Sequence, residues 1–207
     1  MDSRTKSVKP FAKVSIEDIR RRELIEAAYL TFLEHGLNGT TMARIGERAG
    51  MSHGIVNYYF KSKDELLSAV VRKSMFMIFG DMAKSLRVAS SPRERVSAII
   101  QANLSEESFT GDIARAWVSF YAYFGKYAEF DRIQRAFDRR VLSNLRHDLR
   151  ALVGEANVER VALSVAALID GLWIRHAKID DRTTSAEAIS LIETYVDREI
   201  EAYKAGL

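Results

Sequence analysis

Apolar residues recur along most of the chain at intervals of three or four positions, the spacing that gathers them on one face of an α-helix. The alternating pattern of half-buried strands is missing, and so are the tight turns that join strands. The pattern therefore predicts an all-α fold with about nine helices. Their expected ranges are 17–35, 42–49, 53–58, 62–87, 93–108, 112–126, 128–152, 157–178 and 184–204.

Residues that begin and end helices mark these boundaries. Ser15 and the aspartate three positions later have the spacing of a capping box, and Gly36 stands where a left-handed residue commonly ends a helix. Thr40 and Thr41 are candidate N-caps of the second helix, and Ser52 is the candidate for the third. Two short helices joined by a glycine-containing turn are typical of a helix-turn-helix.

Composition divides the chain into three parts. Residues 1–15 are polar and basic and contain Pro10, which indicates a flexible arm. Such an arm is either a solvated tail or a segment that contacts the backbone or groove of DNA. Residues 16–65 are expected to form the helix-turn-helix domain, and residues 66–207 a larger helical domain.

The composition also excludes several classes of function. There is no cysteine, and the four histidines show no metal-ligand spacing, so we expect no disulfide, metal or thiol chemistry. A glycine-rich phosphate loop and a nucleophile elbow are both missing, so we expect neither an enzyme nor a cofactor. Without a long apolar run or a signal peptide, a cytoplasmic protein with no membrane partner is the default.

The stretch AGMSHGIVNYYFKSK, residues 49–63, holds few core-type residues and many polar ones suited to DNA. On the third helix, side chains can hydrogen-bond to base edges, and a glycine lets the backbone approach a duplex. Hydroxyl and lysine groups, with the start of the following helix, can contact phosphate. Because the net charge is only +3, this local pattern is the better indication of DNA binding. The candidate contacts are Thr41, Arg44, Ser52, His53, Gly54, Asn57, Tyr58, Tyr59 and Lys63.

Part of this stretch has a purely structural explanation. Ser52 caps a helix in any case, and His53 alone on a solvated face would indicate little. Val56, Phe60 and one of the two tyrosines are expected in the core. The joint spacing of the polar residues, after the threonine and glycine that bound the preceding helix, is what favours a recognition helix in the major groove.

The segment RRRELIEAAYLTFLEHGLNGTTMARIGERAGMSHGIVNYYFKSKDELL, residues 20–67, resembles the DNA-binding domain of the tetracycline-repressor (TetR) family. The resemblance implies a homodimeric, ligand-responsive transcriptional regulator, usually a repressor, that binds a palindromic DNA operator. Many members of the family carry tyrosine where this chain has Asn57. A phosphate contact is therefore lost, or replaced by an amide that could read adenine.

The later segments ARAWVSFYAYF, RIQRAFDRRVLSNLRHDLR and ALIDGLWIRHA resemble the choline-responsive, BetI-like repressors of the betaine pathway. The resemblance covers roughly residues 96–178 and implies that residues 66–207 bind an effector and dimerise. The effector would be a small molecule, with choline or another cation as the candidate. The same type of C-terminal domain also occurs in regulators with other effectors.

A quaternary ammonium is held by aromatic faces and a carboxylate. Three aromatic residues on the helix expected at 112–126 share one face at i, i+4 and i+7, and polar candidates lie on the neighbouring helices. The alternative is that these aromatics are core, and that the aspartate of LIDGLW pairs with Arg175 or caps a helix. The candidate pocket residues are Asn103, Glu106, Trp117, Tyr121, Phe124, Asp170 and Trp173.

The last two predicted helices carry long apolar stripes, which the resemblance assigns to a homodimer interface across a two-fold axis. The stripes are Val161, Ala162, Val165, Leu168, Ile169 and Leu172, then Ile189, Ile192, Tyr195, Val196 and Ile200. Effector binding would change the spacing of the two recognition helices, with the helix at 62–87 as the lever. The alternative function is a helical ligand-sensing module that does not bind DNA.

Overall fold

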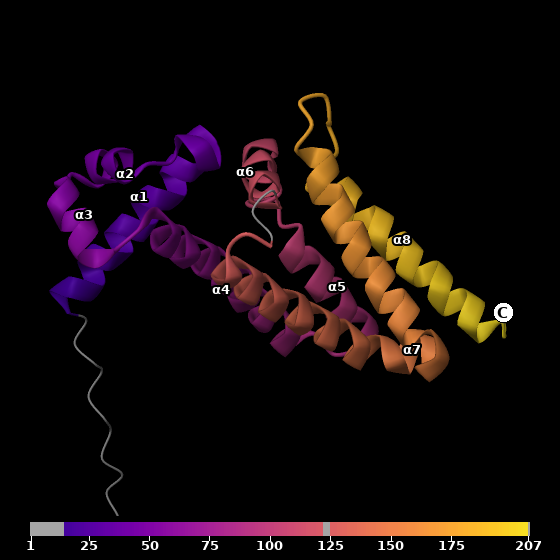
Figure 1. The fold of residues 1–207 in the computed structure, drawn as a ribbon. Helices are drawn as coiled ribbons and strands as arrows, with labels where there is room; N and C mark the ends of the chain where they lie inside the picture. Colours follow the sequence, from indigo (N-terminus) through magenta and orange to yellow (C-terminus); the bar gives the residue numbers. More distant parts are fainter. Residues whose placement is uncertain (1–14, 122–124, 207) are drawn as a thin grey trace, which may run out of the picture.

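The computed structural model describes residues 15–121 and 125–206 of the 207-residue chain, which form eight α-helices and no strand (Figure 1). The predicted all-α fold is confirmed. Of the predicted basic arm, only Ser15 at its end is described. Residues 1–14 lie outside the described residues, and so does the pocket candidate Phe124. The helices are α1 (Ile16–Gly39), α2 (Met42–Ala49), α3 (His53–Tyr59), α4 (Lys63–Val88), α5 (Pro92–Asn103), α6 (Gly111–Tyr121), α7 (Ala128–His176) and α8 (Ser185–Lys204).

Side-chain caps set the starts of these helices. Ser15 and Asp18 form the predicted capping box at the start of α1. Of the two threonine candidates, Thr41 is the cap of α2, because its hydroxyl accepts a hydrogen bond from the backbone N–H of the third helical residue. The Thr40 hydroxyl instead donates to the carbonyl of Gly36, at 2.7 Å, and closes the end of α1.

Several helix boundaries differ from the predicted ones. The first helix continues past the predicted stop at Gly36 to Gly39, with a kink at Gly36 where φ is 62°. The helices expected at 128–152 and 157–178 are one element, α7, with a kink at Gly154 where φ is 74° and ψ is 166°. The helix expected at 93–108 ends at Asn103, because the following residues form a separate turn in which the N–H of Phe109 donates to the carbonyl of Ser105, at 2.8 Å. This turn buries the Phe109 ring in the core of the larger domain.

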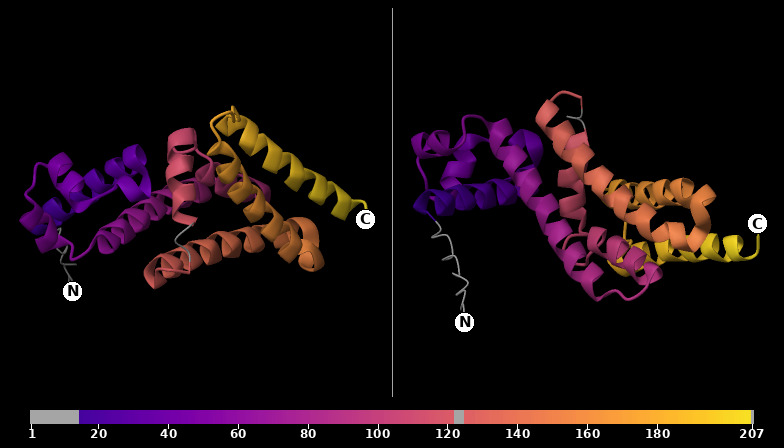
Figure 2. Two further views of the ribbon diagram at one scale, coloured as in Figure 1. Left: turned by 45° about the horizontal axis from the view of Figure 1, so that its top comes forward. Right: turned by 90° about the horizontal axis from the view of Figure 1, so that it is seen from below.

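The first three helices and the start of α4 form a small core at one end of the molecule (Figure 2). Leu24 of α1, Ile45 of α2 and Val56 of α3 are fully buried in it, together with Phe60, which follows α3. A Cβ added at Gly46 would lie 2.8 Å from the carbonyl oxygen of Met51. Glycine at that position therefore lets the turn between α2 and α3 close tightly.

The remaining helices form the larger domain, which α4 joins to the first. In this domain the second half of α7 runs beside α8, and both pack on α5 through a large apolar cluster (Figure 1). A third cluster lies between the domains and joins α1 and α4 to α6 and the first half of α7. In the described residues, no helix is both long and apolar enough to span a membrane.

Replacing Gly154 with alanine is expected to lower the free energy of unfolding by about 1–3 kcal/mol, because its backbone conformation is almost confined to glycine. The added Cβ would also lie 2.8 Å from the Tyr203 ring. Gly80→Ala in α4 is the matched control, since nothing lies within 4 Å of its Cβ, and it should stabilise by about 0.5–1 kcal/mol. Urea unfolding measures both variants, and equal midpoints would contradict this account of the kink.

Candidate functional site

The helix α3 presents one face to solvent at the edge of the small domain. Val56 and Phe60 are fully buried and anchor the helix from below. His53, Gly54 and Tyr58 are exposed, and the Tyr58 side chain is among the most exposed apolar ones, at 67%. A short exposed helix that follows a tight turn is the geometry with which a helix-turn-helix enters the major groove.

Three of the predicted DNA contacts also stabilise the helices that carry them. The Thr41 hydroxyl accepts from the backbone N–H of Arg44, at 3.3 Å, and the Ser52 hydroxyl accepts from that of Ile55, at 3.4 Å. The Arg44 guanidinium donates to the carbonyl of Gly39, at 2.7 Å. All three predicted residues remain exposed, so their local bonds orient them without removing them from the surface.

Asn57 and Tyr59 are half-buried on the flanks of α3. The side-chain nitrogen of Asn57 lies 3.0 Å from Nδ1 of His53, one helical turn earlier. The Tyr59 ring packs against the core of the small domain and meets the Tyr58 ring edge-on, with 5.1 Å between centroids. Tyr59 is therefore the tyrosine that the sequence assigned to the core, and Tyr58 is the one that is free to face a duplex.

The two lysines of the KSK segment, Lys61 and Lys63, lie in different environments. The Lys63 ammonium donates to the carbonyl of Leu37 at 2.6 Å, and burial lowers the pKa of this group. Lys63 therefore ties the first turn of α4 to the end of α1. Lys61 is exposed and donates to the carbonyl of Tyr58, at 3.3 Å. Sequence reasoning passed over Lys61, although it lies two positions from the predicted contact.

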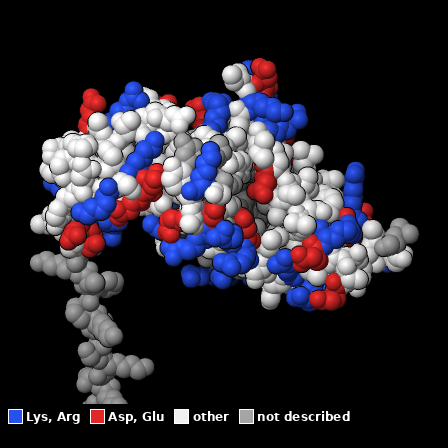
Figure 3. Space-filling model, in the orientation of Figure 1, with Lys and Arg blue, Asp and Glu red and all other residues white. Residues whose placement is uncertain are grey.

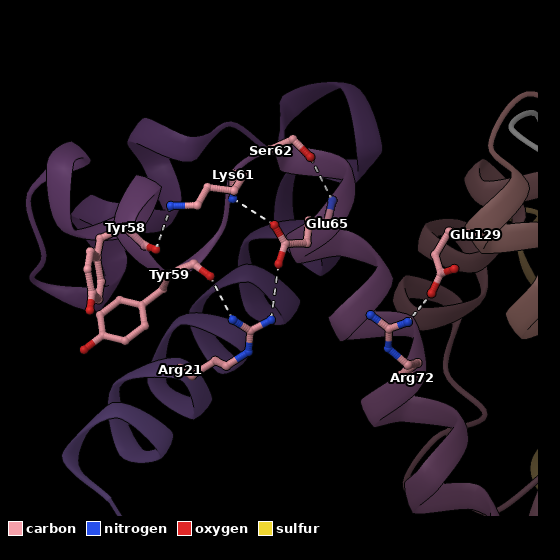
Figure 4. A network of polar contacts seen from close by, with 8 residues as sticks. All are labelled: Arg21, Tyr58, Tyr59, Lys61, Ser62, Glu65, Arg72 and Glu129. Atoms are coloured by element: carbon pink, nitrogen blue, oxygen red, sulfur yellow. Dashed lines mark hydrogen bonds and ion pairs between the residues drawn. The ribbon is translucent and has the colours of Figure 1, made fainter.

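A polar network centred on Arg21 fixes the end of α3 to α1 and α4 (Figure 4). The Arg21 guanidinium donates to the carbonyl of Tyr59 at 2.8 Å and lies 3.4 Å from the carboxylate of Glu65. That carboxylate accepts from the backbone N–H of Lys61, at 2.8 Å, and the N–H of Glu65 donates to Ser62, at 3.1 Å. The end of α3 is thus held by Arg21 of α1, which is itself held by Glu65 in the first turn of α4.

Charged side chains of both signs are interspersed over the face of the molecule shown in Figure 3. No single basic field covers this face, in agreement with the small net charge of +3. A DNA interface on this face would therefore depend on a few placed cations and hydrogen-bond donors.

A cavity of about 320 Å³ lies in the larger domain between α4, α5, α6 and α7. Its walls are mainly apolar and aromatic, the usual character of a small-molecule site. A second, more open cavity of about 440 Å³ shares four of its residues and adds Asp131, Arg135 and Ile174, so it forms an outer chamber. The predicted pocket residues that line the first cavity are Asn103, Trp117, Tyr121, Asp170 and Trp173.

Glu106 does not line the cavity. Because α5 ends at Asn103, Glu106 lies in the exposed turn that follows. The opposite wall, which sequence reasoning missed, comes from the first half of α7 and includes Gln134, Phe137 and Asp138. The sequence signal for this wall was the i, i+3, i+4 spacing of these residues, on a helix whose polar positions resembled a solvated face.

Two carboxylates face this cavity system. Burial, and then the charge of Asp138, raise the pKa of Asp170 to about 6. Burial also raises the pKa of Asp138, although a hydrogen bond from Gln134, at 2.8 Å, opposes the shift. Burial and the two acids raise the pKa of Tyr121 to about 12. In the described part of the chain neither aspartate has a salt bridge, and the Arg175 expected beside Asp170 pairs with Asp181, at 2.9 Å.

Two of the predicted aromatic residues, Trp117 and Trp173, serve both as core and as cavity wall. Trp173 donates from its indole nitrogen to the carbonyl of Asn103 at 3.1 Å, and its ring meets Phe109 edge-on. Trp117 packs edge-on against Phe32 of α1, with 6.3 Å between ring centroids. The Asn103 side-chain nitrogen donates to the carbonyl of Ile99 on its own helix, at 2.8 Å. Among the described residues, no group of three or more acidic or histidine side chains could hold a metal ion.

Comparisons with known proteins find relatives for both the small helix-turn-helix domain and the larger domain that contains the cavity. Residues 24–70 match the family described as bacterial regulatory proteins of the tetR family, and residues 92–201 match the BetI-type transcriptional repressor C-terminal family. The HTH-type transcriptional regulator BetI of Brucella canis is 37% identical over 184 residues, which cover 89% of this chain and 93% of that protein.

Two solved structures are similar over most of the chain. A transcriptional regulator from Pseudomonas aeruginosa PAO1 is 25% identical, with a TM-score of 0.76, and the match covers 91% of this chain and 94% of that one. A regulator from Saccharomonospora viridis, solved in complex with choline, is 18% identical with a TM-score of 0.70, over 87% and 95% of the two chains. The second likeness shows the fold alone.

The Asp170 carboxyl is expected to titrate near pH 6, which carbon-13 NMR of the side-chain carboxyl measures directly. Asp138→Asn should lower this pKa, because the negative charge of Asp138 contributes to raising it. A carboxyl at position 170 that titrates near 4 in the wild-type protein would show that the cavity does not desolvate it.

The raised pKa of Asp170 also predicts how the stability of the protein depends on pH. A pKa that is higher in the folded protein than in the unfolded chain means that folding is favoured by protonation, so stability falls as the pH rises from about 4 to about 6. Asp170→Asn removes this contribution and should be more stable than the wild type above pH 6. The difference should decrease as the pH falls through this range, in urea unfolding at constant protein concentration.

Proposed function

Because the chain belongs to the TetR family, with a BetI-type C-terminal domain, we propose that it is a homodimeric repressor released from a palindromic operator by a small organic cation. Its membership makes the chain a DNA-binding transcriptional repressor and not an enzyme. The alternative of a ligand-sensing module without DNA binding does not agree with this membership. The main support for a cationic effector is the aromatic cavity, which two desolvated carboxylates face.

In the proposed complex, α3 lies in the major groove and α2 meets the DNA backbone. The exposed positions of His53 and Tyr58 on α3 support this placement, as does the exposure of Arg44 on α2. Lys61 is a better candidate than Lys63 for a phosphate contact, because Lys63 is half-buried and bonded to α1. The first described residue is Ser15, next to this domain, so the basic segment before it stays a candidate for a further DNA contact.

The proposed effector is choline or a cation of the same class. A quaternary ammonium has no N–H donor, so it is recognised by aromatic faces and negative charge. Trp117, Tyr121 and Trp173 provide the faces, and Asp138 and Asp170 provide the charge. A pKa of about 6 leaves Asp170 mostly ionised at neutral pH. The choline found in the Saccharomonospora viridis regulator is consistent with this class of effector.

The proposed dimer can use only a small part of the predicted stripes, together with other exposed apolar residues of the same helices. Most of those residues are buried inside one protomer and cannot contact a partner: Val161, Ala162, Val165, Ile169, Ile192, Val196 and Ile200. Five large apolar side chains on the same two helices are exposed, namely Leu163, Leu168 and Ile174 of α7 and Leu191 and Tyr203 of α8, and of these Leu168 belongs to the predicted stripes. Burying them against a second copy would remove apolar surface from water and pair the two recognition helices.

The proposed switch runs through two helices that touch both the cavity and the small domain. Val71 and Met75 of α4 line the cavity, and the first turn of α4 bonds to Arg21, which holds the end of α3. Trp117 of α6 lines the cavity and packs on Phe32 of α1. A cation that fits one arrangement of these helices better would shift the dimer toward it, by no more than its difference in affinity for the two arrangements.

Choline is expected to raise the dissociation constant of the protein for its operator, once a binding duplex has been selected from a random pool. Asp170→Asn should weaken this response, with a choline affinity lower by about tenfold to a hundredfold, because a charged partner is lost. The response of the wild type should also weaken below pH 6, as Asp170 becomes protonated. Fluorescence anisotropy of the duplex, with choline titrated at several pH values, measures both effects.

The matched control is Asp180→Asn, which changes the net charge equally in an exposed loop that does not line the first cavity. It should keep the choline response of the wild type. An Asp170→Asn protein that binds DNA and still responds normally to choline would overturn the assignment of the effector site.

Leu168→Glu is expected to shift the protein from dimer to monomer in sedimentation velocity, because it places a charge in the proposed apolar interface. This residue does not line the cavity, so choline binding by the monomer should persist. Val88→Glu is the control, since Val88 is equally apolar and more exposed but lies at the end of α4. Equal sedimentation of the two variants would place the interface elsewhere.

A further inference from the structure

His53 and Asn57 form a pair on the exposed side of α3. They are four residues apart, which places their side chains one above the other on a helix. The side-chain nitrogen of Asn57 lies 3.0 Å from Nδ1 of His53 and 3.5 Å from Nε2, so the bond to Nδ1 is the better one. His53 is also the first residue of α3 and is exposed.

This contact favours one position of the ring proton. With the amide nitrogen of Asn57 as the donor, Nδ1 of the neutral imidazole is the acceptor, and the proton is then on Nε2. The ring therefore presents an N–H donor on the side away from Asn57. If the proton were on Nδ1 instead, the amide would have to present its oxygen, and Nε2 would become an acceptor. The partner of His53 thus decides which hydrogen-bonding group the ring offers.

We propose that His53 reads a guanine in each operator half-site through Nε2–H, and that Asn57 is the positioning residue that sets this tautomer. In the major groove guanine offers two adjacent acceptors, N7 and O6, and no donor. Cytosine presents only a donor. Adenine has one acceptor, N7, beside an amino donor, and thymine has one acceptor, O4, beside a methyl group, so guanine is the base that best accepts an N–H. The inference rests on the proposed placement of α3 in the major groove.

This assignment differs from the direct reading of adenine by Asn57. In that alternative the amide nitrogen and oxygen would both bond to the base, and His53 would be a bystander. In the pair described here, one N–H of Asn57 is engaged with the ring. The two readings predict different partners for the same two side chains, so they can be distinguished.

The first experiment measures the tautomer. In protein with ¹⁵N-labelled histidine at pH 8, long-range ¹H–¹⁵N correlation spectra distinguish Nε2–H from Nδ1–H rings, and His53→Ala assigns the signal. The expected result is an Nε2–H ring in the wild type and a mixture of tautomers in Asn57→Ala. A predominantly Nδ1–H ring, or the same spectrum in both proteins, would overturn the positioning role.

The second experiment measures the base contact. Each guanine of a selected duplex is replaced in turn by 7-deazaguanine, which removes the N7 acceptor and keeps base pairing. One guanine per half-site should cost the wild type about threefold to tenfold in affinity, the value of one hydrogen bond. His53→Ala should lose this penalty, and Asn57→Ala should show a smaller one, with the salt dependence of binding unchanged in both because neither residue contacts phosphate.

The other outcomes are equally informative. A full penalty in Asn57→Ala would overturn the coupling between the two residues. Sensitivity to 7-deazaadenine that disappears in Asn57→Ala would support direct reading of adenine by the amide. If salt-dependent binding persists and no deazapurine matters, the guanine contact fails while DNA binding stands. If neither alanine variant changes the affinity for the selected duplex at all, the placement of α3 in the groove fails with it.

Discussion

The shared packing of α4 is the constraint on which the rest of the structure depends. Leu66 and Val70 are buried in the core of the small domain, whereas Leu67 and Val71 are buried in the cluster that joins α1 to α6 and α7. Further along, Met82 enters the core of the larger domain. Since one continuous helix supplies all three clusters, and close-packed cores resist deformation, the two domains cannot change their arrangement without displacing α4.

The cavity adds a second constraint, because its two carboxylates are unfavourable without a ligand. Their raised pKa values show that the folded protein disfavours their charged forms. A bound cation would reverse that effect, and a ligand that binds only the folded form stabilises it by mass action. The site therefore gives up some stability of the free protein in exchange for selective binding of positive charge. Apolar ligands of similar size would gain nothing from the two acids.

The sequence was sufficient for features that depend on neighbouring residues. The capping box at Ser15, the cap at Thr41 and the break at Gly154 follow from local rules of hydrogen bonding and backbone conformation. The far wall of the cavity could not be predicted, because only the kink at Gly154 folds one half of α7 back and brings Asp138 near Asp170. Before that fold is known, the polar positions of residues 128–152 are those of any solvated helix.

The dependence on tertiary packing also explains why the roles of Lys63 and of the apolar stripes differ from the predicted ones. Lys63 has the right charge and spacing for a phosphate contact, but a carbonyl at the end of α1, 26 positions away, captures its ammonium group. The apolar stripes of the last two helices could equally face a partner or their own core, and their periodicity is identical in both cases. Only the tertiary packing shows that the core takes most of the stripe and leaves Leu168 exposed.

In the proposed mechanism, DNA recognition and effector-dependent release depend on separate parts of the molecule. The side chains that would face a duplex lie on α2 and α3, and the groups that would bind a cation lie on α6 and α7. The described connections between them are apolar packing through α1 and α4 and the network centred on Arg21, none of which contacts a base in the proposed complex. A change on the exposed face of α3 can therefore alter the sequence preference without altering the response to effector. A change in the cavity can alter the response without altering the preference, which lets one scaffold combine different operators with different ligands.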